Sequence, residues 1–395
     1  MKNPWNLSES ELKEKKAIFT ATETCQQPQA WLDTLAILAE KRAEIETFVT
    51  PLLKKEKLQI IFTGAGTSDY VGDTIAPYLR NRLGKRVDAI ATTDIVSSPA
   101  QYLEKDTPTV LVSFARSGNS PESVAAYDLA EQLVDEIYQI VITCNAEGTL
   151  AKRASKSEKG NALLIVNPAQ TNDLGFAMTS SFTSMIISGL MVFTLGTFEE
   201  NVKLVKRLAA CGEKILENDH GLVDIANSNV KRLVFLGSAG LGGFAQEMCL
   251  KVLELTSGKL VAVSESIMGF RHGPKSIIND DTVVIAFVST DAYTRQYDLD
   301  LLRELHNDQG GFKVLAVTAV PDAHVKALVD QNLVVDESTD SVWGNDAYMA
   351  LGYALFGHIL ALAASLAQQI TSDNPRPDGT VNRVVKGVTI HAFEN

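Results

Sequence analysis

The sequence predicts an α/β protein with two similar halves, each a mostly parallel sheet flanked by helices in a three-layer arrangement. Short apolar runs alternate with helical segments, which is typical of parallel β-α-β units. This alternation occurs twice in the 395 residues, with a join near residues 200–220. We therefore expect an internal duplication of element order without close sequence identity. A chain of this length can bury a large core.

The first fifty residues predict a helical arm. Ser8 and Glu11 form a capping-box pattern, which marks a helix start. After Pro28, residues 29–49 carry apolar side chains at helical spacing. The expected organisation is an arm at 1–48, a first domain at 49–208, a second domain at 212–370 and a C-terminal tail at 371–395.

Ten short apolar runs are the expected strands. They lie at residues 58–64, 87–94, 109–114, 138–144 and 161–167 in the first half, and at 260–265, 282–289, 313–319 and 333–335 in the second, where residues 232–240 are expected to be a strand followed by a Gly-rich loop. Helices are expected at 73–83 and 244–258. Two longer apolar stretches, 185–198 and 351–367, are interpreted as buried helices. The first is short for a bilayer, and the second carries His358 near its middle.

Composition and charge limit the partners of the chain. The net charge of −12, from 36 basic and 48 acidic residues, argues against nucleic acid or an anionic membrane as the main partner. The four cysteines lack C-x-x-C spacing, which favours free thiols in a reducing cytoplasm. The charged N-terminus has no apolar core and is not expected to be a signal peptide. The histidines show no metal-ligand spacing, so no metal site is expected.

The loop "GAGTS" (64–68) follows an expected strand and precedes a helix. Free backbone N–H groups at such a helix start favour an anion. Asp69 stands where a dinucleotide fingerprint would have glycine, and Thr67 and Ser68 instead suggest one phosphate held by hydroxyls and amides. A plain tight turn is the alternative for this loop taken alone.

Two further loops repeat this composition. In "SGNS" (117–120), Ser120 and Pro121 have the pattern of a helix start, which does not require the small polar residues before them. In "AMTSSFTS" (177–184), three hydroxyls precede an apolar helix, and any one could be local capping. Three such loops in one half indicate an anion site. Its candidate residues are Gly66, Thr67, Ser68, Ser117, Gly118, Asn119, Ser120, Thr179 and Ser180.

The second half contains a weaker, competing signal. "GLGGFA" (240–245) satisfies G-x-G-x-x-A, and Glu265 closes a strand near the spacing of a ribose contact. This pattern supports the alternative of a dinucleotide enzyme, although such glycine patterns are common.

Charged residues on the next helix are candidates for chemistry. Glu247, Lys251 and Glu254 fall at i, i+4 and i+7 on one face of an otherwise apolar helix, so they need partners or a cleft. A solvated charged face is the alternative. His272 lies on a Gly/Pro turn in "GFRHGPKS" (269–276) and can titrate near neutrality, or can be an ordinary surface histidine.

These motifs together resemble the sugar isomerase (SIS) superfamily, which binds phosphosugars. "GAGTS", "ARSGNSPE", the "TSS" loop, "EMCLKVLE" and "RHGP" occur in the family's order, from about residue 45 to the C-terminus. The chain is similar to two SIS domains in tandem, like the isomerase half of glucosamine-6-phosphate synthase. It most resembles the AgaS group of galactosamine-6-phosphate deaminase/isomerases, also labelled tagatose-6-phosphate ketose/aldose isomerases. "GFAMTSS", "GFRHGPKS" and "YTRQYDLDLL" are characteristic of that group.

The resemblance implies roles for particular residues. Glu254 matches the glutamate that moves a proton between C1 and C2. His272 matches the histidine that opens the sugar ring from the neighbouring subunit, which implies a homodimer or higher homo-oligomer. Lys386 matches a lysine in an active-site tail. The remaining active-site candidates on the family's motifs are Gly66, Arg116, Glu247 and Lys251, besides the phosphate-binding loops. Ala115 replaces a serine of the synthase pattern, and Arg116 could replace the lost hydroxyl contact.

The resemblance further implies a substrate and a reaction. A phosphorylated amino sugar would open its ring, exchange a proton between C2 and C1, and lose ammonia by imine hydrolysis, without a cofactor. Three alternatives remain: an isomerase without deamination, a non-catalytic phosphosugar-binding protein, and a nicotinamide-dependent dehydrogenase.

Overall fold

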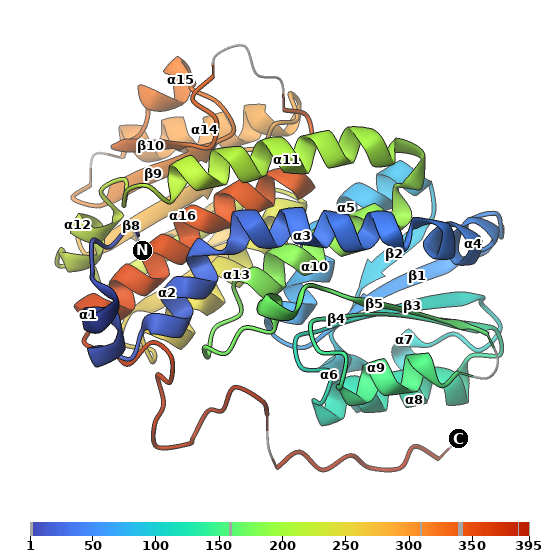
Figure 1. The fold of residues 1–395 in the computed structure, drawn as a ribbon. Coiled ribbons are helices and arrows are strands. Elements are labelled where there is room, and N and C mark those ends of the chain that lie inside the picture. The colour runs from blue at the N-terminus through green and yellow to red at the C-terminus, as the bar shows by residue number, and fades with distance from the viewer. Residues whose placement is uncertain (1–2, 158–159, 309, 339–342, 386, 395) are drawn as a thin grey trace. The chain divides into compact units, whose positions relative to one another are not determined.

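The computed structural model describes residues 3–157, 160–308, 310–338, 343–385 and 387–394. The described chain forms two compact units, each around one sheet (Figure 1). The first-sheet unit comprises residues 29–173, 180–203 and 378–395. The second-sheet unit comprises residues 1–28, 174–179 and 204–377. The chain therefore passes between the units several times.

The first-sheet unit contains a five-stranded parallel sheet in the order β2-β1-β3-β4-β5. Helices α5 and α10 pack together on one face, and α6, α8 and α9 lie on the opposite face (Figure 1). The elements are α3 (Gln27–Glu40), α4 (Arg42–Leu53), β1 (Gln59–Thr63), α5 (Thr67–Leu83), β2 (Arg86–Ala89), α6 (Thr92–Ser97), α7 (Pro99–Tyr102), β3 (Thr109–Ala115), α8 (Pro121–Leu133), β4 (Ile137–Thr143), α9 (Thr149–Ser155), β5 (Ala162–Val166), η1 (Ala169–Thr171), α10 (Ser180–Phe193) and η2 (Leu195–Thr197).

The second-sheet unit repeats this topology. Its parallel strands run β7-β6-β8-β9-β10, which is the same order once the second five strands are renumbered. The elements are α1 (Glu9–Glu14), α2 (Ile18–Cys25), α11 (Phe198–Ile215), α12 (Leu222–Asn227), β6 (Arg232–Gly237), α13 (Gly240–Leu255), β7 (Val261–Glu265), η3 (Gly269–His272), η4 (Pro274–Ile277), β8 (Thr282–Phe287), α14 (Thr294–Asn307), β9 (Lys313–Thr318), α15 (Ala323–Lys326), β10 (Gln331–Val334) and α16 (Asp346–Ala367). The predicted α/β class and the duplication are confirmed.

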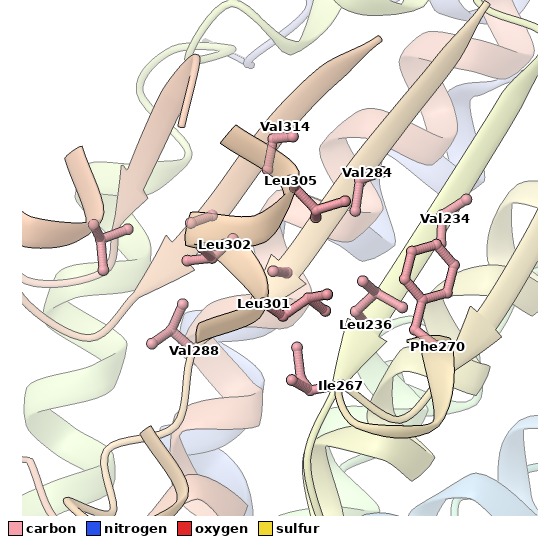
Figure 2. Packing of buried hydrophobic residues seen from close by; sticks show 13 residues of the cluster. Val234, Leu236, Ile267, Phe270, Val284, Val288, Leu301, Leu302, Leu305 and Val314 are labelled. Carbon is pink, nitrogen blue, oxygen red and sulfur yellow. The ribbon is translucent and has the colours of Figure 1, made fainter. Parts of the chain in front are cut away.

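Alternation along the strands divides each sheet into two packed faces. In the second-sheet unit, Val284 and Ala286 face leucines of α14, as Figure 2 shows for Val284. Phe287 faces the other way and contacts Phe244 of α13 and Tyr353 of α16. Both faces are buried, which explains why the strands are continuous apolar runs rather than alternating ones.

The predicted helices differ from the observed ones mainly at their ends. Ser8 forms the expected capping box with Glu11. The helical stretch at 29–49 is two helices, α3 and α4, which break at Lys41, and Pro28 lies inside the first turn of α3. Proline fits there because first-turn N–H groups need no helical acceptor. Helices α5 and α13 begin several residues earlier than predicted: α5 already starts at Thr67, directly after the glycines of its loop, and the glycines at 240–243 lie inside α13.

The two long apolar stretches are buried helices, as predicted. All residues of α10 are buried, as are nineteen residues of α16. By length and hydropathy alone, α16 could cross a membrane, and α10 with the following residues up to Ile215 forms a second candidate bent by 99°. In the apolar window of α16, however, 94% of the residues are buried inside the structure, as in the core helix of a globular unit.

Candidate functional site

The first sheet has a switch point between β1 and β3. In the order β2-β1-β3-β4-β5, the connections after β1 and β3 lead to opposite directions along the sheet. The register places Thr63 of β1 beside Ser113 of β3, so the two following loops start from neighbouring positions. Ligands of open parallel sheets bind in the crevice at the carboxyl ends of such strands. The sequence "GAGTS" follows β1, and "SGNS" follows β3.

The loop after β1 is held in a tight conformation. A side chain at Gly64 would approach the Ser68 carbonyl carbon to 2.3 Å, so only glycine fits. Gly66 has φ 58°, and Thr92 donates to the Gly64 carbonyl through its N–H (2.7 Å) and its hydroxyl (3.0 Å). Thr67 and Ser68 form the first turn of α5, where the Ser68 N–H donates to the Ala65 carbonyl at 3.3 Å and the helix N-terminus favours negative charge. This geometry suits an anion.

The loop after β3 leads directly into α8. Ser120 is the N-cap residue and Pro121 is at N1, as predicted, but the Ser120 side chain makes no capping hydrogen bond. Gly118 has φ +65°. The Asn119 side-chain oxygen accepts hydrogen bonds from the Thr149 N–H and hydroxyl, each at 3.0 Å. The helix start explains the backbone of this loop, whereas the Ser120 hydroxyl is not used for capping.

The third loop is organised by Asp173, which the sequence analysis did not single out. Its carboxylate accepts hydrogen bonds from the Ser180 hydroxyl and from the Ser181 N–H (2.9 Å) and hydroxyl (2.6 Å). All three residues are buried. Capping of α10 is therefore one role of these serines. Thr179, the preceding residue, belongs to the second-sheet unit.

Asp69 adds a titratable group to the first turn of α5. Burial raises its pKa to about 7, and the charges of Asp73 and Asp94 add to this effect. The pKa of Asp73 is raised by burial as well. An ionised carboxylate beside an anion-binding loop would oppose an anion, so a pKa near 7 makes the loop more favourable to an anion below neutral pH.

Asp69→Asn is expected to change how stability depends on pH. A folded-state pKa above the unfolded value of 3.8 means that the folded state binds the proton more tightly. The stabilisation from protonated Asp69 is complete below pH 3.8 and is lost as pH rises through 7. The variant should therefore gain more in melting temperature over wild type at pH 8 than at pH 5. Asp106→Asn, at an exposed loop position, is the control, and an equal gain at both pH values would contradict the assignment.

Helix α13 carries a buried chain of charges. The Lys251 ammonium lies 2.6 Å from Glu254 Oε2 and 3.4 Å from Glu247 Oε1. The side chains of Lys251 and Glu247 are 1% and 0% exposed, whereas that of Glu254 is 22% exposed. The alternative of a solvated charged face is therefore wrong for the first two residues. Glu254 is the accessible end of the group.

His358 on α16 lies in the same unit, since α16 packs against α13. Its Nδ1 is 3.0 Å from Gln27 Nε2. Burial, followed by the charge of Lys251, lowers the pKa of His358 to about 3. The imidazole is neutral at physiological pH, and it accepts a hydrogen bond from the Gln27 amide at Nδ1. His358 thus adds no second charge beside Lys251.

His272 is exposed at the end of η3, on a turn that is fixed by its neighbours. Phe270 is fully buried in the core beside α14 (Figure 2). Glu304 of α14 pairs with Arg271 at 2.7 Å and with Lys275 at 2.5 Å. These contacts hold the turn while its histidine faces out of the second-sheet unit.

The second sheet has the corresponding switch point, but carboxylates of the chain itself accept hydrogen bonds from the donors there. Asp298 accepts from the Ser238 hydroxyl after β6 and from the Ser289 N–H after β8, each at 2.8 Å. Asp346 accepts from the Ser289 hydroxyl (2.5 Å) and from the Thr290 N–H (2.7 Å) and hydroxyl (2.6 Å). These groups correspond in topology to the loops of the first switch point. At the second switch point, these donors therefore bind carboxylates of the chain itself.

The "GLGGFA" pattern does not have the geometry of a dinucleotide fingerprint. Gly240 and Gly242 already lie inside α13, and the turn from β6 into this helix is formed by Ser238 and Ala239. The first glycine of the fingerprint belongs in that turn. The glycine pattern therefore lies in the helix rather than in the turn after β6. Glu265 does end β7, but the glycine turn that would accompany a ribose contact is not formed by this pattern.

The structure divides the candidate residues between the two units. The first-sheet unit contains Gly66, Thr67, Ser68, Arg116, Ser117, Gly118, Asn119, Ser120 and Ser180, and the second-sheet unit contains Thr179, Glu247, Lys251, Glu254 and His272. Lys386 lies outside the described residues. Within the described ranges, no cluster of three or more His, Cys, Asp or Glu could hold a metal ion. All four cysteines are free thiols.

Comparison with known proteins defines the class. The SIS domain model matches residues 52–195 and 227–357, and the chain belongs to the SIS domain family. Each match covers a different one of the two sheets with its helices, in agreement with the duplicated topology.

Within this family, the chain is similar to the AgaS group. It is 45% identical over 378 residues to D-galactosamine-6-phosphate deaminase AgaS of Escherichia coli, covering 95% of this chain and 96% of the relative. It is 41% identical over 393 residues to D-galactosamine-6-phosphate deaminase AgaS of Shewanella sp. (strain ANA-3), covering 98% and 95%. The crystal structure of tagatose-6-phosphate ketose/aldose isomerase from Escherichia coli superimposes with a TM-score of 0.84 at 42% identity, covering 95% of this chain and 97% of that chain.

Proposed function

We propose that the protein converts D-galactosamine 6-phosphate and water to D-tagatose 6-phosphate and ammonia. The observation that carries this proposal is the identity of 41–45% over at least 95% of the chain to proteins named D-galactosamine-6-phosphate deaminase. The charged group on α13 and the anion-compatible loops of the first sheet supply residue types that this reaction needs.

The first step is binding of the 6-phosphate. Hydroxyls and backbone N–H groups of the "GAGTS" and "SGNS" loops are the proposed ligands, with Thr179 and Ser180 as further candidates. Both main loops open helices, and helix N-termini favour negative charge. Holding the phosphate fixes the non-reacting end of the sugar and orients C1 and C2.

The chemical steps are proton transfers followed by hydrolysis. After ring opening, for which His272 is the proposed acid and base, the sugar is a 2-amino aldehyde. Glu254 removes the C2 proton and returns it to C1, which converts the aldehyde and amine into a C1 alcohol and a C2 imine. Water adds to the imine carbon, and the C–N bond breaks to give the ketone and ammonia. Lys386, in the C-terminal tail, is a further proposed catalytic residue.

The buried pair of Lys251 and Glu247 supports the role of Glu254. The buried Lys251 ammonium lies 2.6 Å from Glu254 Oε2, while 22% of the Glu254 side chain remains exposed. A base must be accessible to substrate and fixed in orientation, and Glu254 meets both conditions within its own unit.

His272 and the cysteines suggest the assembly and location. An exposed histidine on a turn pinned by Glu304 is suited to act on a second copy of the chain. We therefore propose a homodimer or higher homo-oligomer in which His272 is shared across subunits. Four free thiols fit a reducing cytoplasm.

An isomerase without deamination is the second candidate, because a relative of solved structure is named tagatose-6-phosphate ketose/aldose isomerase. The deciding experiment incubates the purified protein separately with galactosamine 6-phosphate, glucosamine 6-phosphate and tagatose 6-phosphate. Ammonia and ketose phosphate are measured together. We expect equal amounts of ammonia and tagatose 6-phosphate from the galacto substrate. Conversion of tagatose 6-phosphate to an aldose phosphate, with no ammonia from either amino sugar, would favour the second candidate.

Ser120→Ala is expected to weaken binding of the phosphorylated substrate. The Ser120 hydroxyl makes no capping bond, so its loss should cost little stability while removing a phosphate contact. We expect the Michaelis constant for galactosamine 6-phosphate to rise about tenfold, as for loss of one hydrogen bond to a charged group. Ser8→Ala, which removes a true helix cap, is the opposite control: it should lower thermal stability and leave the Michaelis constant unchanged. An unchanged constant for Ser120→Ala would argue against the phosphate role.

A further inference from the structure

Arg383 lies in the C-terminal segment, by which we mean residues 378–394. Its side chain binds a loop more than 200 residues away in sequence. Its Nε donates to the Asp173 carbonyl at 2.9 Å, and its Nη2 donates to the same carbonyl and to the Asn172 carbonyl at 3.2 Å. The Asn172 side-chain oxygen accepts a further bond at 3.3 Å. One planar guanidinium thus binds two successive carbonyl groups, and its rigid fork of donors fixes their geometry, whereas the three rotatable donors of a lysine ammonium would not.

The loop held by Arg383 also organises the start of α10. Asp173 is 1% exposed, and its carboxylate accepts from Ser180 and Ser181 while its carbonyl accepts from Arg383. The position of this peptide therefore sets where the carboxylate lies. Through that carboxylate, it sets the hydroxyl-rich turn at the N-terminus of α10.

A second arginine connects the same segment to the "SGNS" loop. Arg116 is 7% exposed, and its Nη2 donates to the Arg383 carbonyl at 2.9 Å. Arg116 directly precedes Ser117 in sequence. The main chain at residue 383 is therefore tied to the end of β3, while its side chain is tied to residues 172 and 173. Two hydroxyl-rich loops meet at one residue of the C-terminal segment.

The far end of the segment is also attached to the first-sheet unit. Gln132 of α8 donates to the Phe393 carbonyl at 3.0 Å, and the Phe393 ring packs against the core under α8. Figure 1 shows the described part of the segment running along this side of the sheet, toward α8. The segment is thus held at two places.

We propose that Arg383 is a positioning residue that fastens the C-terminal segment to the loops after β3 and before α10 and thereby sets their geometry for the substrate phosphate. The effect on substrate rests on the proposed function, whereas the fastening itself does not. Arg383 touches no reacting atom in this proposal and acts through Asp173, together with Arg116.

Hydrogen exchange on the full-length, substrate-free protein tests the fastening. In Arg383→Ala, we expect faster exchange in peptides covering 172–185, which include the Ser181 amide bonded to Asp173, and in peptides covering the segment at 378–394. Arg303→Ala, which removes an exposed arginine paired only with Asp300 on α14, is the matched charge control and should change neither region. Exchange in both regions equal to that of wild type would overturn the proposal, whatever the enzyme activity.

Kinetics test the effect on substrate. Arg383→Ala should raise the Michaelis constant for galactosamine 6-phosphate about tenfold or more, with a smaller change in kcat, as expected for lost charge-assisted hydrogen bonds. Arg383→Lys should recover only part of the loss, and it also serves if the alanine variant folds poorly. A lower melting temperature with an unchanged Michaelis constant would show a merely structural role and overturn the positioning role. Absence of turnover in wild type would contradict the proposed function, and the exchange experiment would still decide the fastening.

Discussion

Glu254→Gln is expected to reduce kcat for galactosamine 6-phosphate by about a thousandfold, because general acid–base catalysis contributes about 10²–10⁴. The amide keeps the size of the side chain and can still accept a hydrogen bond from Lys251, so the helix should remain folded. It cannot take the C2 proton. Ammonia release gives the rate, and calorimetric titration with the same sugar phosphate should give a dissociation constant close to that of wild type.

A second measurement on this variant isolates the proton transfer. With substrate that carries deuterium at C2, wild type should transfer deuterium to C1 of the product, and Glu254→Gln should not do so within the same time. Glu46→Gln, an exposed position on α4, is the matched control and should behave as wild type. Turnover like that of wild type in Glu254→Gln would remove Glu254 as the base and leave the family membership intact.

Much of the fold could be predicted from the sequence because both sheets are buried on two faces. The central strands then become continuous apolar runs. All ten predicted strands are present, although the one predicted at 87–94 ends at Ala89 and its last three residues belong to α6. Helix ends were less accurate, as at Lys41, where a periodic stretch breaks without proline or glycine. The apolar periodicity continues through this break, so the sequence pattern does not indicate where the helix ends.

The candidate site was predicted where composition is unusual and missed where tertiary contacts decide. The hydroxyl-rich loops could be identified because ordinary helix starts do not need so many small polar residues. Asp173 and Arg383 carry no local signal: the Asp173 carboxylate accepts from residues seven and eight positions ahead, and the Arg383 guanidinium binds carbonyls more than 200 residues away. Asp298 was missed for the same reason. It lies on α14, and its carboxylate accepts a hydrogen bond from the loop after β8, which precedes that helix.

The duplication explains why the two halves have different composition at equivalent places. The loops of the first switch point keep hydroxyls and amides that are suited to an external anion. In the second, Asp298 and Asp346 accept the corresponding donors, and burial raises the pKa of Asp298 to about 6. The second half has instead the charged group on α13.

Lys251→Met is expected to have the largest effect on stability, a loss of about 3–5 kcal/mol. Removing one partner of a buried ion pair weakens the compensation of the buried charge that remains. Here, Glu247 is 0% exposed and would lose its ammonium partner at 3.4 Å, and Glu254 would lose its own at 2.6 Å. Urea unfolding and the melting temperature measure the loss. Lys13→Met, which breaks an exposed i,i+4 pair with Glu9, should change stability far less, because water screens that pair.

The double variant Lys251→Met with Glu247→Gln separates charge from packing. Replacing the buried Glu247 carboxylate by a neutral amide removes most of the cost of burying a charge there. The double variant should therefore be more stable than Lys251→Met alone. If both variants lose the same stability, the loss comes from packing rather than from buried charge. A loss in Lys251→Met no greater than in Lys13→Met would show that water reaches the pair. Since Lys251 also orients Glu254, the double variant should recover stability without recovering full turnover.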